Sequence, residues 1–154
     1  MVFDTADLAA LEEAGGLVDT VTHEMGHVLG VGTLWAERGL MVGQGTALPL
    51  YVGPAGAAEF GRLAGLDGPA AAPLEGGGGP GTREVHWSEA VLGNELMTGF
   101  VNAGANPLSR LTVASLEDLG YAVDYAGADE FLGEGAAALV ADAAALATGG
   151  DFLA

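Results

Sequence analysis

The motif that fixes the rest of this chain is Val21-Thr22-His23-Glu24-Met25-Gly26-His27-Val28-Leu29-Gly30. It contains the pattern H-E-x-x-H, and histidines four residues apart lie on one face of an α-helix. His23 and His27 can therefore reach one metal ion from the same side. Glu24 lies about 100° around the helix from His23, where its carboxylate reaches a ligand of the metal rather than the metal itself. The pattern predicts a zinc hydrolase site with two nitrogen ligands and a general base.

A helix over about 16–31 is expected to carry this motif, ending near Gly30 to Gly32. Its histidine side is small and polar, and its opposite side is apolar. The apolar back consists of Leu17, Val18, Val21, Met25, Val28 and Leu29. Gly26 and Gly30 lie on the histidine side, although glycine lowers helix stability by roughly 1 kcal/mol. We therefore expect another part of the chain to approach the backbone there.

Composition limits the partners and the ligand chemistry. The 154 residues are typical of one domain, and 4 basic against 21 acidic residues give a net charge of −17. This charge disfavours binding to nucleic acid or to anionic membranes. The chain has no cysteine, so zinc must be held by histidine and carboxylate. Calcium binding by the carboxylates is an alternative without a supporting D-x-D-x-D-G loop, and solubility is the simpler explanation of the acidity.

The N-terminal residues are expected to begin within a fold, at the end of a strand. No signal peptide is visible, and no apolar run reaches the length of a membrane span. Met1 to Phe3 is expected to be the end of a strand, and Thr5 is expected to cap a helix over Ala6 to Ala14. The sequence specifies no oligomeric state.

A long segment with few regular elements follows the motif. Residues 36–83 are expected to be loop, apart from one short helix at Ala55 to Ala64. The Gly-rich tract 76–81 lacks the G-K-[ST] ending of a phosphate-binding loop. We expect this insertion, about 33–85, to be functional because loops of this length are unusual in a compact domain.

Two residues are candidates for a third metal ligand. A catalytic zinc usually takes three protein ligands and leaves a fourth position for water. His86 is favoured because it is the only histidine outside the motif. Glu95, in Asn94-Glu95-Leu96-Met97, is the alternative, and would complete a site of two histidines and one glutamate. For Met97, both ordinary core filling and a turn beneath the metal remain open.

The C-terminal part is expected to contain a helix, a short strand and a tail, of which the tail carries no recognisable chemistry and serves in packing or as a tether. Ser109 or Thr112 is expected to cap a helix over about 110–120 that Gly120 ends. Tyr121 to Tyr125 alternates like a short strand. The Ala-rich residues 126–154 form a tail that is expected to be helical from Glu134 to Thr148.

These motifs together resemble the leishmanolysin-like branch of the metzincin zinc peptidases. Most metzincins carry H-E-x-x-H-x-x-G-x-x-H and, later, a methionine turn. Here the motif fits through Gly30, and Thr33 stands where the third histidine is usual. The leishmanolysin-like branch has a long insertion at this point. The matching segments, in order, are His23 to Gly30, His86-Trp87, Gly93-Asn94-Glu95-Leu96-Met97-Thr98, and Leu111-Thr112 through Asp118-Leu119-Gly120-Tyr121.

The resemblance implies a zincin-like α+β fold, with a catalytic region over residues 1–125. It implies zinc ligands at His23, His27 and His86, a catalytic base at Glu24, and a methionine turn at Met97. It also moves Glu95 away from the zinc, into a structural role beside the turn.

The activity implied is that of a zinc-dependent endopeptidase acting on protein or peptide substrates, outside the cell or at its surface, with Trp87 and the long loop shaping the cleft. The upper β-sheet subdomain of the family is expected to be largely absent, as in a fragment. Without disulfides, the chain looks more like a bacterial-type member. The alternative is a catalytically incomplete zinc-binding domain used for structure or interaction.

Overall fold

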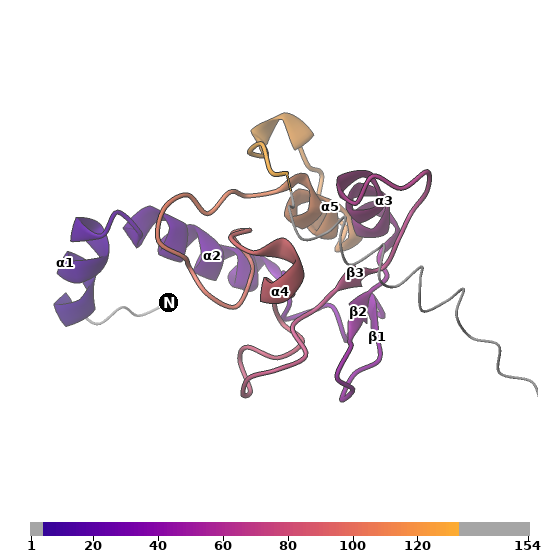
Figure 1. The fold of residues 1–154 in the computed structure, drawn as a ribbon, viewed down its shortest axis with the longest axis horizontal. Helices are drawn as coiled ribbons and strands as arrows, with labels where there is room; N and C mark the ends of the chain where they lie inside the picture. Colours follow the sequence, from indigo (N-terminus) through magenta and orange to yellow (C-terminus); the bar gives the residue numbers. More distant parts are fainter. Residues whose placement is uncertain (1–4, 133–154) are drawn as a thin grey trace, which may run out of the picture.

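The computed structural model describes residues 5–132 as an α+β fold (Figure 1). The strand expected at 1–3 and the helix expected from Glu134 to Thr148 lie outside these residues. The elements, in order, are α1 (Thr5–Glu13), α2 (Leu17–Leu29), β1 (Met41–Val42), β2 (Leu50–Tyr51), α3 (Pro54–Leu63), β3 (Ala72–Pro73), α4 (Glu89–Leu92), α5 (Arg110–Asp118) and the 3-10 helix η1 (Tyr125–Gly127). None of the helices described is both long enough and apolar enough to cross a membrane.

The motif helix α2 ends where the glycines predict. Gly30 adopts φ +109°, in the left-handed region, and the Val31 N–H donates back to the Gly26 carbonyl at 3.0 Å. The Thr33 hydroxyl donates to the His27 carbonyl at 2.9 Å. Thr33, at the position of the usual third histidine, thus helps to close the end of the helix.

The apolar back of α2 faces solvent among the residues that the structure describes. Val18 is 73% exposed, Met25 54% and Val28 75%. An amphipathic helix ordinarily buries such a face. The core lies elsewhere, between the insertion and the C-terminal half of the chain.

The insertion contributes a small sheet and much of the core, and the expectation of one helix in a loop was incomplete. Strands β1, β2 and β3 form an antiparallel sheet in that order, with Met41 opposite Tyr51 and Tyr51 opposite Ala72. Two residues per strand are too few for the alternation that predicts strands from sequence. Trp35, Tyr51 and Trp87 are fully buried, with ring centroids 4.5–5.2 Å apart.

Helices α3 and α5 lie side by side in Figure 1, and a side chain of α5 caps the N-terminus of α3. The Asp118 carboxylate, at the end of α5, accepts from the backbone N–H groups of Ala55 and Gly56 and from the Tyr51 hydroxyl, each at 2.9 Å. These N–H groups belong to the first turn of α3, whose N-cap residue Gly53 has no side chain to bind them. Asp118 therefore caps α3 from another helix.

The strand expected at Tyr121 to Tyr125 is wrong. Residues 121–124 lie in no helix or strand, and Tyr125 begins η1. The Asp124 carboxylate accepts from the Ala126 N–H at 2.9 Å, which starts a tight turn. Alternating apolar side chains gave a strand-like pattern, but local capping by aspartate determined the conformation. Upstream, Gly120 adopts φ +101° just after α5, as its predicted role at the helix end requires.

Candidate metal centre

Three histidine side chains converge at one point. His23 and His27 come from α2, and His86 comes from the segment between the insertion and α4. The three Nε2 atoms are 3.0 Å apart for His23–His27 and His27–His86, and 3.1 Å apart for His23–His86. The fold thus brings a residue 59 positions from His27 to the face of the motif helix.

Backbone carbonyls fix the tautomer of each ring. The Nδ1 atoms donate to Leu96 O from His23 at 2.7 Å, to Val31 O from His27 at 2.9 Å, and to Thr82 O from His86 at 2.9 Å. Because a carbonyl oxygen only accepts, each Nδ1 carries the proton and each Nε2 presents a lone pair.

This donor set fits a zinc ion. Three lone pairs about 3 Å apart repel one another unless a cation lies between them, because no proton remains to join them. Imidazole nitrogen is a preferred ligand of Zn²⁺, and a carbonyl on the far nitrogen is the usual support of a metal-bound histidine. Three protein ligands also match the count of a catalytic site rather than a closed structural one.

Burial favours the neutral, metal-binding form of two of these rings. Desolvation lowers the pKa of His86 to about 4, and the neighbouring imidazoles act in the same direction. Desolvation likewise lowers the pKa of His23. For each ring, burial outweighs the backbone hydrogen bond and the negative charge of Glu24, both of which raise the pKa.

The backbone around Gly32 sets the position of His86. A Cβ on Gly32 would lie 1.9 Å from the carbonyl oxygen of Val85, and Gly32 adopts φ +74°. The chain leaving α2 therefore touches the residue just before His86. This contact was not predicted from the sequence. The only signal for it was a third glycine, two residues after Gly30.

Met97 lies against the histidine face of α2. A Cβ on Gly26 would lie 2.8 Å from the Met97 sulfur, and Met97 is 1% exposed. Gly30 is approached in turn by the side chains of Leu34 and Leu119. The expected close approaches at Gly26 and Gly30 are both present.

Two other expectations concern the surroundings of the cluster. Glu95 lies outside the group of possible metal ligands, and its carboxylate accepts hydrogen bonds from Met97, Ser109 and Thr112. Trp87 is fully buried and its indole N–H donates to the Thr112 hydroxyl at 2.8 Å, so the expectation that it shapes a cleft is wrong.

Comparison with known proteins agrees with the arrangement of the motifs. The model of the leishmanolysin family matches residues 1–140, which is most of the chain. No curated protein matches the chain significantly. The match covers the motif helix, the insertion, His86 and the methionine segment in one alignment, and the chain belongs to the leishmanolysin family of metallopeptidases.

Proposed function

We propose that this protein is a zinc-dependent endopeptidase of zincin-like fold whose catalytic region spans residues 1–125. His23, His27 and His86 hold one zinc ion, and Met97 lies beneath them as the methionine of the turn. The convergence of three lone-pair nitrogens within 3.0–3.1 Å carries the proposal. The proposed substrates are protein or peptide chains, and membership of the family supports a location outside the cell or at its surface.

The histidines and Glu24 have separate roles in the proposed hydrolysis. When bound, zinc supplies Lewis-acid activation of water and of the scissile carbonyl. The three neutral imidazoles leave its positive charge undiminished, because none of them carries a negative charge. The Glu24 carboxylate accepts a proton from the attacking water and passes it to the nitrogen of the leaving amine.

A glutamine at position 24 tests the proposal. Glu24→Gln should bind zinc like the wild type and lose chelator-sensitive cleavage of a quenched peptide or casein, because the amide cannot accept the proton. Glu37→Gln, the same change at an exposed site, is the matched control and should keep full activity. A Glu24→Gln variant that still cleaves at the wild-type rate would exclude Glu24 as the base.

One observation favours a second candidate, a zinc-binding domain without peptidase activity. The side chains of Val18, Met25 and Val28 are exposed on the apolar side of the motif helix, opposite the histidines. An exposed apolar face of this kind favours contact with another protein, which is an interaction role rather than a catalytic one. Zinc-loaded protein that cleaves no peptide, with or without chelator, would favour this candidate.

A further inference from the structure

Glu95 is a fully buried carboxylate to which the proposed chemistry gives no part. Its Oε2 accepts from the Met97 N–H at 2.6 Å. Its Oε1 accepts from the Ser109 N–H at 3.1 Å and from the hydroxyls of Ser109 and Thr112, each at 2.6 Å. The Thr112 oxygen itself accepts from the Trp87 indole, so its proton points to Glu95. Four donors thus surround one carboxylate at the start of α5.

The segment that Glu95 holds contacts the histidine cluster at several points. The Leu96 carbonyl accepts from Nδ1 of His23 at 2.7 Å, and the Met97 carbonyl accepts from the backbone N–H of Trp87 at 3.0 Å. Trp87 follows His86 directly, and the Met97 sulfur packs at Gly26 between the two motif histidines. The backbone of Leu96 and Met97 therefore orients the His23 ring and holds the segment that carries His86.

We propose that Glu95 is a positioning residue of the metal centre, whose carboxylate holds Leu96 and Met97 where they orient His23 and the segment of His86. The proposal rests on the zinc site proposed above. It differs from a purely structural role, in which Glu95 would stabilise the fold without influencing the geometry of the histidines. Glu95 acts through two routes. The first is its hydrogen bond from the Met97 N–H, and the second is its hydrogen bond from Thr112, which in turn accepts from the Trp87 indole.

Glu95→Gln tests the first route with almost no change in shape. The three donors at Oε1 require the amide oxygen there, so the amide NH₂ faces the Met97 N–H and that hydrogen bond is lost. We expect zinc affinity, measured by competition with a chromogenic chelator, to fall about tenfold or more. We also expect the visible absorption bands of the Co²⁺-loaded protein to shift, since they report ligand geometry.

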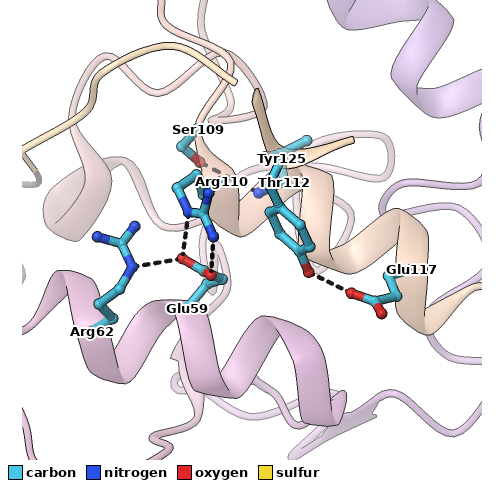
Figure 2. A network of polar contacts seen from close by, with 7 residues as sticks. All are labelled: Glu59, Arg62, Ser109, Arg110, Thr112, Glu117 and Tyr125. Atoms are coloured by element: carbon cyan, nitrogen blue, oxygen red, sulfur yellow. Dashed lines mark hydrogen bonds and ion pairs between the residues drawn. The ribbon is translucent and has the colours of Figure 1, made fainter. Parts of the chain in front are cut away.

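Glu59→Gln is the matched control. Its carboxylate bridges α3 and α5, accepting from Arg110 at 2.8 and 3.1 Å and from Arg62 at 2.8 Å (Figure 2). Neither arginine contacts the histidine cluster through a hydrogen bond among the described residues. We expect this variant to lose some thermal stability while its zinc affinity and Co²⁺ spectrum stay at wild-type values. The spectrum separates positioning from stability, because a loss of stability alone does not move it.

The outcomes distinguish this inference from the proposed function. A wild-type protein that binds no zinc would overturn both. Wild-type zinc binding together with an unchanged affinity and Co²⁺ spectrum in Glu95→Gln would overturn the positioning role alone. If Glu95→Gln does not fold, Thr112→Val breaks the second route and should weaken zinc binding severalfold. An unchanged affinity and spectrum in that variant would overturn the proposal equally.

Discussion

Gly32 shows how one missing side chain can place a metal ligand. Gly32→Ala would bring a Cβ to 1.9 Å from the Val85 carbonyl oxygen, so the backbone before His86 must move. We expect the free energy of unfolding to fall by about 2 kcal/mol or more and zinc affinity to fall severalfold. Chemical denaturation of the zinc-free protein and chelator competition measure the two effects.

Gly39 offers a matched control for this prediction. It adopts φ +68°, close to the +74° of Gly32, but has nothing within 4 Å of a Cβ. Gly39→Ala should therefore lose only about 1 kcal/mol from left-handed strain and keep zinc affinity. Equal effects in the two variants would show that strain, rather than contact with Val85, explains Gly32.

At the level of residues, the sequence predicts the three histidines of the cluster but not the contacts that orient them. The spacing of His23 and His27 predicts that they meet, and the ligand count favours His86 among the remaining residues. The carbonyl partners of the Nδ1 atoms are invisible in a sequence, because Leu96 and Thr82 accept through backbone oxygens that every residue has. The role of Gly32 depends on a contact with Val85 that only the folded chain creates.

Among the elements, α3 depends on α5 for its N-terminal cap. Asp118→Asn keeps the size of the side chain but turns an NH₂ group toward at least one of the donors at Ala55, Gly56 and Tyr51. We expect the free energy of unfolding to fall by about 1–3 kcal/mol, since a buried donor loses its acceptor. Urea denaturation measures it, with Asp67→Asn at an exposed position as the control. Equal stability of the two variants would contradict the capping of α3 by Asp118.

Helix α2 differs from an ordinary amphipathic helix because the exposed apolar residues on its back are expected to add little to the free energy of unfolding. Val28 on its back is 75% exposed, whereas Val31, three residues later, is fully buried. Val28→Ala should change the free energy of unfolding by less than about 0.5 kcal/mol, and Val31→Ala should lower it by about 2 kcal/mol. Denaturant unfolding of the pair checks this. A comparable loss in Val28→Ala would mean that the back of α2 is covered in solution.

At the scale of the whole molecule, the longer helices were predictable from the sequence, whereas α4, η1 and the core were not. Helical periodicity and caps predict segments close to α2, α3 and α5, because those signals are local. The sheet was missed, since its strands of two residues depend on pairing across the insertion. The cluster of Trp35, Tyr51 and Trp87 joins residues up to 52 positions apart, and no local pattern reports such a contact.

The buried imidazoles make the free energy of unfolding depend on pH. The pKa of His86 is lowered from 6.5 to about 4, so the unfolded chain binds more protons than the folded chain between these values. His86 should therefore contribute stability to the zinc-free protein that increases with pH through this window and is lost as pH falls from 6.5 toward 4. His23, whose pKa is also lowered, acts in the same direction.

Comparison with His86→Gln isolates this contribution. The variant lacks one titrating ring, so its stability should fall less steeply between pH 6.5 and 4.5 than that of the wild type. Urea denaturation at several pH values with excess chelator measures both proteins, and the many acidic groups common to them cancel in the difference. Parallel curves would show that His86 titrates alike in the folded and unfolded chains, contrary to its burial beside two other imidazoles.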